Sequence, residues 1–318
     1  MTDHGDRLRG PAETAIDQCM GLAAGESCLV VTDDERRAIG EALRAVAADR
    51  TDAASMLTYP PGDQHGEEPP APVGAAMAAA DVVIAPTTKS ISHTRAREAA
   101  CEAGARIATL PGITESVFRT GLDADYGAIA DACDRIYDAV AGAEEIHVST
   151  ARGTDVTVRP MDREWHRDTG IVHDPGDFSN LPAGEVFVSP AHVEGRIVVD
   201  GTMMPHGAID DPITIDVTAG TITYVDDAAL REELDAAADR SGDGAFNLAE
   251  FGIGTNAAVT DLVGSVLLDE KAAGTVHFAI GDDASIGGDT EAAIHLDGIV
   301  CDPTVTVDGT PLELPSTE

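Results

Sequence analysis

The chain contains few lysines, few aromatic residues and no long apolar run. Lys89 and Lys271 are the only lysines among 20 basic residues, and Phe, Trp and Tyr make up 3% of the chain. The 57 acidic residues give a formal net charge of -37. A surface this negative repels phosphate backbones and anionic lipids, so neither nucleic acid nor an anionic membrane is expected as a partner.

The acidic residues are scattered along the chain instead of forming one tail, which indicates a hydrated surface. Their repulsion is tolerable at high salt, because the Debye length falls to about 3 Å near 1 M. Halophilic proteins use high net charge to stay soluble, and an ordinary acidic protein fits the near-absence of lysine less well. We therefore expect a salt-rich cytoplasm, and we consider only carboxylates in apolar surroundings as candidate site residues.

Several motifs that would indicate other classes of protein are missing. The five cysteines are isolated, odd in number and without a CxxC pair, which indicates reduced thiols in a cytosolic protein. The segment MTDHGDRLRG has no apolar h-region, and no run approaches the roughly 20 residues of a membrane span. No GxGxxG follows the first predicted strand and no Walker lysine occurs, so nothing indicates nucleotide binding. A soluble cytoplasmic protein is expected.

Residues 1–142 alternate between predicted strands and helices. Strands are predicted at 27–33, 54–60, 81–87 and 106–112, and helices at 35–50, 93–105 and 126–140. Strands separated by helices are typical of α/β folds with a doubly wound parallel sheet. Asp33 follows the first strand, where ligands often bind in such sheets, but we interpret it as a loop cap. Lys89 and His93 form the most polar loop of this half, and a substrate contact there is a further hypothesis.

Residues 143–318 are predicted to form a β-rich α+β domain that contains every candidate metal ligand. The segment 144–160 is typical of a hairpin with an Arg-Gly turn, and only 227–239 is clearly helical. Further short strands are predicted at 184–190, 195–204, 213–225, 275–281, 293–300 and 304–314. Three histidines of its loops are expected at the surface: His173, His192 and His206.

Metal-binding side chains are concentrated in the last fifth of the chain, on segments predicted to be buried strands. His277 lies in TVHFAIG, His295 and Asp297 lie in AIHLDGIV, and Asp269 and Glu270 precede both. Positions i and i+2 of a strand point to the same face, so His295 and Asp297 share one. A buried carboxylate is costly unless a cation or hydrogen bonds compensate. Imidazoles beside carboxylates favour Zn, Mn or Fe(II) over Ca or Mg. The alternative is core histidines hydrogen-bonded to the backbone.

The segment DRSGDGAFNLAE fits an EF-hand calcium loop. Asp239, Ser241, Asp243, Gly244 and Glu250 occupy positions 1, 3, 5, 6 and 12, and a predicted helix precedes them. The following FGIGTN carries two glycines where the exit helix should continue, and no partner hand occurs. We interpret the match as coincidental, with Glu250 next to a glycine-broken loop and available to another metal.

Several C-terminal motifs resemble the metal-dependent aminopeptidase family that includes aminopeptidase T. They are GEVFVSP, AEFGIGTN, the DEK…GTVHFAIG run and HLDGIV, and SHTRAREAACEAGARIATLPGIT resembles the family's other domain. The resemblance implies two divalent ions (Zn, Co, Mn or Fe(II)), hydrolysis of N-terminal residues from peptides, and a homodimer. The ligands that it implies are Glu185, Glu250, Glu270, His277, His295 and Asp297, with Glu250 as a bridging ligand or general base. Without the resemblance, Glu185 and Glu270 would be interpreted as solvated strand ends.

One departure from the family pattern leaves two explanations open: another group replaces a catalytic residue, or the reaction differs. The aminopeptidases carry a catalytic tyrosine seven residues after the first ligand histidine, and this chain has Ala284 there, with no tyrosine after Tyr224. A related branch contains 2,5-dihydroxypyridine ring-cleaving dioxygenases, which bind one Fe(II) through two histidines and a carboxylate. His277, His295 and Asp297 could supply that triad. A two-metal aminopeptidase is the first hypothesis, an Fe(II) dioxygenase the alternative, and a non-enzymatic metal-binding protein the third.

Overall fold

The computed structural model describes residues 2–316. It divides into two compact units, of which the first contains the chain up to Ala130 and Thr169–Ala183. The second contains Asp131–Asp168 and the chain from Gly184 onward. Within residues 2–316, no helix is long and apolar enough to cross a membrane.

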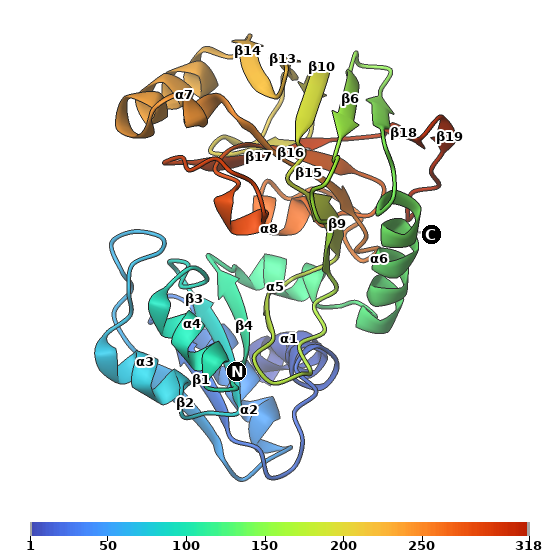
Figure 1. Cartoon of the computed structure of the whole chain (residues 1–318). Helices are drawn as coiled ribbons and strands as arrows, with labels where there is room; N and C mark the ends of the chain where they lie inside the picture. The colour runs from blue at the N-terminus through green and yellow to red at the C-terminus, as the bar shows by residue number, and fades with distance from the viewer. Residues whose placement is uncertain (1, 317–318) are drawn as a thin grey trace. The chain divides into compact units, whose positions relative to one another are not determined.

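The first unit is built on a five-stranded parallel sheet (Figure 1). Its order is β2 (Ala54–Thr58), β1 (Cys28–Thr32), β3 (Val82–Thr87), β4 (Arg106–Pro111) and β8 (Phe178–Asn180). Parallel neighbours require long crossovers, which helices supply here. The helices are α1 (Thr2–Glu13), η1 (Thr14–Cys19), α2 (Arg37–Ala48), α3 (Ala71–Met77), α4 (Arg95–Glu102) and α5 (Glu115–Gly121). The predicted parallel-sheet class is confirmed.

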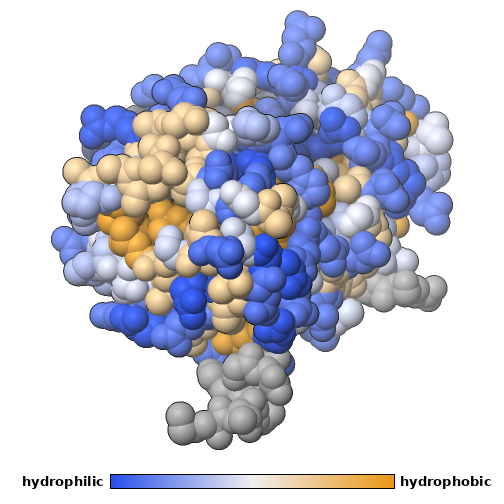
Figure 2. Space-filling view, turned by 90° about the horizontal axis from the view of Figure 1, so that it is seen from below, coloured by the Kyte–Doolittle hydropathy of each residue, from blue (hydrophilic) through white to orange (hydrophobic). Residues whose placement is uncertain are grey.

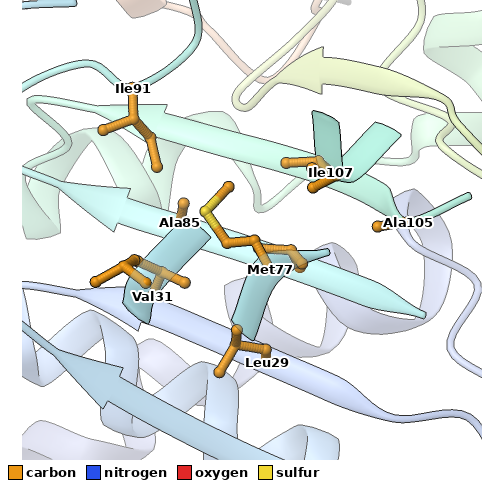
Figure 3. Packing of buried hydrophobic residues seen from close by; sticks show 10 residues of the cluster. Leu29, Val31, Met77, Ala85, Ile91, Ala105 and Ile107 are labelled. Atoms are coloured by element: carbon orange, nitrogen blue, oxygen red, sulfur yellow. The ribbon is translucent and has the colours of Figure 1, made fainter. Parts of the chain in front are cut away.

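The core of this unit is formed by apolar side chains of neighbouring strands and the helix that covers them (Figure 3). Leu29 and Val31 lie two residues apart on β1, and they pack in one cluster with Ala85, Ile107 and Met77 of α3. All five positions of β1 are buried, because a central parallel strand is covered on both faces. This explains why its sequence is a continuous apolar run instead of an alternating one.

The second unit contains two antiparallel sheets of seven strands each. The first has the order β14 (Thr221–Val225), β13 (Ile213–Thr218), β10 (His192–Val199), β6 (Asp155–Arg159), β5 (Ile146–Ser149), β18 (Thr304–Val307) and β19 (Thr310–Pro311). The second has the order β12 (Gly207–Ala208), β11 (Thr202–Met203), β17 (His295–Val300), β16 (Val276–Gly281), β15 (Leu248–Gly254), β9 (Glu185–Val188) and β7 (His166–Asp168). The helical segments are α7 (Ala228–Ser241), η2 (Asp243–Phe246), α8 (Val266–Asp269) and η3 (Ala284–Ile286). Figure 1 shows the first of these sheets stacked on the second, and the second carries the candidate site.

The bounds of the two units differ from the division expected after residue 142. Helix α6 (Tyr126–Val140) begins in the first unit and ends in the second. Phe178–Asn180 returns to the first unit as β8 and pairs with β4, Ile107 lying opposite Phe178. Because this pairing joins segments far apart in the sequence, no local change in composition marks it.

The segment that was expected to be a glycine-broken loop is instead the buried strand β15 (Leu248–Gly254). It lies between β9 and β16, which pair with it along both edges. The EF-hand match therefore leads into a strand and not into a second helix, in agreement with its interpretation as coincidental. The expectation of a loop was wrong because glycines in a strand can also mark places where other groups approach the backbone closely.

Candidate metal centre

The pairing of four strands places the candidate ligands on one face of the second sheet. Directly opposed residues of paired strands share a face, and residues two apart along a strand also share one. Gly254 lies opposite Glu185, and Gly252 lies opposite His277. The remaining pairs are Glu250 with Ala279, Ala279 with Asp297, and Gly281 with His295. The register therefore brings Glu185, Glu250, His277, His295 and Asp297 to a common face.

Two glycines of β15 make room for this arrangement. A Cβ added at Gly252 would lie 2.1 Å from Nε2 of His277, so the imidazole lies directly over the glycine. A Cβ at Gly254 would lie 2.1 Å from the carbonyl oxygen of Ala272, which belongs to the segment that follows α8. Contacts that short exclude any side chain, which explains the alternation of glycine in the EFGIG sequence.

Glu250 lies between the two imidazoles. Its Oε1 is 3.2 Å from Nε2 of His277, and its Oε2 is 3.5 Å from Nε2 of His295. Nε2 of His295 is also 3.5 Å from Oδ1 of Asp297, and Nε2 of His277 is 3.4 Å from Oε2 of Glu185. The five side chains thus form one continuous row of alternating carboxylates and imidazoles.

The burial of this row is uneven. His277 is fully buried, and Glu185, Glu250 and Asp297 are nearly so. His295 was expected to be buried as well, but its side chain is 36% exposed. The difference arises because His295 is the first residue of β17, where Nδ1 contacts the carbonyl oxygen of Asp282 at 2.7 Å. His295 is therefore the ligand candidate nearest to solvent.

The electrostatics of the row follow from its burial and its pairing. Burial opposes ionisation of Glu250, but hydrogen bonds from His277 and His295 hold the pKa of its carboxyl well below the ordinary range. Burial likewise disfavours the charged form of His277, yet its hydrogen bond with Glu250 and the charge of Glu185 raise its pKa to about 9. Imidazoles that hold protons this firmly must release them to a metal ion, so metal binding is expected to release protons.

Lys271, which sequence reasoning did not select, closes the row at the Glu185 end. Its Nζ forms a close ion pair with Oε1 of Glu185 and lies 2.8 Å from Oε1 of Glu270 and 3.9 Å from Oδ2 of Asp168. Burial raises the pKa of Glu185 to about 8, although the Lys271 charge opposes that shift. Glu270, which the resemblance implied as a metal ligand, instead forms an ion pair with Lys271. The signal that could have identified Lys271 is its rarity, since it is one of two lysines in the chain.

The donor set fits a divalent transition metal. Metal–ligand bonds to imidazole and carboxylate are about 2.0–2.2 Å, which places adjacent ligand atoms around one ion about 3 Å apart. The separations of 3.2 to 3.5 Å in the row are close to that value. Glu185, Glu250 and His277 offer ligand atoms that all lie within 4.8 Å of one another. Oε2 of Glu185, which faces Nε2 of His277, is buried without a hydrogen-bond partner among the described residues, as a group awaiting a ligand would be.

Asp269 does not belong to the row, although it lies in the metal-rich segment of the sequence. It is fully buried, and its carboxylate accepts hydrogen bonds from Oγ1 of Thr202 and from the backbone N–H groups of Val263 and Gly264. Such a carboxylate is satisfied by the protein itself. Asp269 stabilises the loop before α8 and is not a metal ligand.

Two polar residues considered in the sequence analysis, Asp33 and His173, contact backbone groups. Asp33 accepts hydrogen bonds from the backbone N–H groups of Glu35, Arg36 and Thr88, in agreement with its interpretation as a loop cap. Nε2 of His173 contacts the carbonyl oxygen of Gln18. None of these contacts involves a side chain of the row of carboxylates and imidazoles.

Comparison with known proteins identifies the family of the chain. A family model described as 2,5-dihydroxypyridine 5,6-dioxygenase (NicX) matches residues 12–313, whereas no curated protein matches the chain. The structure of 2,5-dihydroxypyridine dioxygenase from Pseudomonas putida KT2440 has 18% identity and a TM-score of 0.79, over 99% of this chain and 97% of that one. AmpT from Thermus thermophilus has 21% identity and a TM-score of 0.68, over 97% and 98%. At these identities the two structures show a shared fold, while the family match over most of the chain shows that this protein belongs to the 2,5-dihydroxypyridine 5,6-dioxygenase family.

Proposed function

We propose that the protein is an Fe(II)-dependent dioxygenase that opens a hydroxylated N-heteroaromatic ring, with His277, His295 and Asp297 as the metal ligands. Two imidazoles and one carboxylate form the donor set of non-haem Fe(II) oxygenases, which leaves coordination positions free for oxygen and substrate. The observation that carries the proposal is that the strand register places these side chains on one sheet face, with Nε2 of His295 3.5 Å from Oδ1 of Asp297, in a chain that matches the dioxygenase family over residues 12–313. Both atoms of O₂ would enter the opened product, so no separate reductant is needed.

The surroundings of the ligands suit a flat aromatic substrate. Phe187 pairs with Gly252, which pairs with His277, so Phe187 lies on the face that carries the ligands. It stacks with His166, with ring centroids 5.1 Å apart and planes inclined by 26°. Both rings are half-buried, in a chain with only 3% aromatic residues. We propose that the substrate ring packs against this pair, because offset stacking favours such contacts.

Glu250 has a separate role in this proposal. The triad is complete without it, yet its two oxygens lie 3.2 and 3.5 Å from the two imidazoles. Metal binding to the imidazoles would remove the hydrogen bonds that lower the pKa of Glu250, and the ionised carboxylate would then be suited to accept the proton of a substrate hydroxyl. We therefore assign Glu250 as the general base.

Oxygen consumption tests the proposal directly. Protein loaded anaerobically with Fe(II) in concentrated KCl should consume O₂ when 2,5-dihydroxypyridine or a related hydroxypyridine is added. His295→Ala should lower this rate at least about a hundredfold, because removal of a ligand weakens metal binding more than the 10–100-fold typical of supporting residues. His147→Ala, which removes an exposed histidine paired with Asp155, is the matched control. No oxygen uptake across a panel of hydroxypyridines and catechols would reject the proposal.

An aminopeptidase is the second candidate, and the observation that favours it is the three glutamates that accompany the triad. The structural likeness to AmpT is compatible with that activity. Against it, Ala284 occupies the position of the family's catalytic tyrosine and lies exposed in η3. Hydrolysis of leucyl-nitroanilide by Zn- or Co-loaded protein, together with absent oxygen uptake, would reverse the order of the two candidates.

A further inference from the structure

We propose that the ammonium group of Lys271 takes the place of a second metal ion, so that the centre holds a single divalent cation. The inference rests on the proposed metal centre, but not on the reaction that the centre catalyses. It concerns the three carboxylates that converge on Nζ of Lys271, namely Asp168, Glu185 and Glu270. Three carboxylates alone would attract a divalent cation strongly.

The distances show that the ammonium and a second ion would compete for the same space. Nζ of Lys271 is in direct contact with Oε1 of Glu185 and lies 2.8 Å from Oε1 of Glu270. A metal ion would have to approach the same oxygens to about 2.0–2.2 Å. It would then lie next to the ammonium group, and the two positive charges would repel each other at short range in a buried site.

Lys271 is held in this position by its backbone and by its burial. Its N–H donates to the carbonyl oxygen of Leu268, and its own carbonyl oxygen accepts from Asn256. The residue is 3% exposed, so its ammonium group cannot move to solvent without opening the packing around it. An ammonium buried this deeply is stable only while its carboxylate partners remain in place.

Glu185 divides the centre into two parts. One of its oxygens contacts Lys271, and the other faces His277 at 3.4 Å. On the far side of His277 lie Glu250, His295 and Asp297, which have the imidazole and carboxylate donors that suit a transition metal. The carboxylate part is neutralised by lysine, and the imidazole part is left for the ion.

Counting bound ions tests the inference. Equilibrium dialysis against Mn(II) in concentrated KCl, with the protein and metal measured separately, should give one tightly bound ion per wild-type chain. Lys271→Met keeps the apolar stem but removes the charge, and it should bind two ions. Lys271→Arg keeps the charge and should bind one, and Lys89→Met is the matched control at the other lysine. Electron paramagnetic resonance gives a second measurement. An isolated Mn(II) ion has a six-line spectrum, whereas two neighbouring Mn(II) ions in the Lys271→Met protein should give a spectrum broadened by spin coupling.

The outcomes separate the inference from the proposed function. Two tight ions in the wild-type protein would overturn the role of Lys271 and leave the metal centre intact. One ion in both the wild-type protein and folded Lys271→Met would overturn it as well. No retained ion in the wild-type protein would overturn the metal centre, and this inference with it. Where Lys271→Met fails to fold, Lys271→Gln, which is neutral but polar, takes its place in the count with the same expectation of two ions.

Discussion

His277 depends on a neighbour that has no side chain. Its imidazole covers Gly252 so closely that an added Cβ would lie 2.1 Å from the ring. The ring cannot retreat, because the residue is fully buried and Nε2 lies between Glu185 and Glu250. The position of a proposed metal ligand thus depends on the glycine that lies beneath its ring.

We predict that Gly252→Ala displaces the His277 ring and prevents tight metal binding. The added methyl group should also destabilise the protein by about 1–3 kcal/mol, as overpacking of a buried site does. Metal content after dialysis and the denaturant midpoint are the measurements. Gly142→Ala is the control, because a Cβ there would meet nothing within 4 Å. Retention of a full complement of metal by Gly252→Ala would show that the imidazole is free to move.

The Glu26–Arg106 pair predicts a pH dependence that does not involve the metal centre. Both guanidinium nitrogens Nη1 and Nη2 of Arg106 lie 2.8 Å from the Glu26 carboxylate, and these hydrogen bonds lower the pKa of Glu26. A carboxyl whose pKa is lower in the folded protein adds stability above its unfolded pKa. That stability is lost as the pH falls through the folded value.

Glu26→Gln should therefore lower the free energy of unfolding by about 1–3 kcal/mol at pH 7, within the range of charged hydrogen bonds. The difference between wild type and variant should shrink below about pH 4, the ordinary range of a glutamate. Denaturant titrations at pH 7 and below about pH 4 measure the difference in the free energy of unfolding. A difference that stays constant across this range would show that the pair does not stabilise the fold through its charge.

At the scale of elements, the site is a product of strand register. β9, β15, β16 and β17 each contribute one or two ligand candidates, and a shift of one residue would turn each set to the opposite face. The opposite face is apolar and carries Phe251 and Phe278, which pack 5.2 Å apart, with Trp165 against Phe251. This packing maintains the register on which the site depends.

The stacked pair on β7 and β9 gives a prediction about substrate binding. Phe187→Ala should raise KM at least about fivefold, because loss of an aromatic contact costs about 0.5–1.5 kcal/mol beyond its buried area. Its metal content should be unchanged, since Phe187 offers no ligand atom. Steady-state oxygen uptake and metal analysis of the same preparation measure the two effects. An unchanged KM would place the substrate ring elsewhere on this face.

At the scale of the whole molecule, the charge of -37 governs behaviour in solution. The charged pairs of the surface are mostly exposed, among them Arg196–Asp216 and Arg231–Asp235, and such pairs contribute little stability. Repulsion between the remaining carboxylates opposes the folded state at low salt.

We therefore predict that the unfolding temperature rises by at least about 5 °C between 0.1 M and 2 M KCl, as the Debye length falls from about 10 Å to below 3 Å. Thermal scans followed by circular dichroism measure the change. Sucrose at matched osmolality is the control, because it does not screen charge. Equal stabilisation by sucrose would show that solute exclusion, and not screening, is responsible. The homodimer also remains a prediction, which light scattering in the same buffers can test.

Some features of this protein follow from local patterns in the sequence. Alternation of strands with helices predicted the parallel sheet, because continuous apolar runs such as CLVVT require cover on both faces. The i, i+2 spacing of His295 and Asp297 predicted a shared face, since the period of a strand is a property of its own backbone. The large excess of acidic over basic residues likewise predicts that polyanions are not partners, without any knowledge of the fold.

Other features were decided only by contacts between distant segments. Lys271 meets Glu185 across 86 positions of sequence, and Phe178 pairs with Ile107 to complete a sheet in the other unit. The glycines of β15 are typical of a loop in the sequence, whereas in the structure they make room for the His277 ring and the backbone of Ala272. A local pattern reports burial and periodicity, but strand register and the partner of a buried charge depend on which segments meet. Those are settled by the packing of the whole chain.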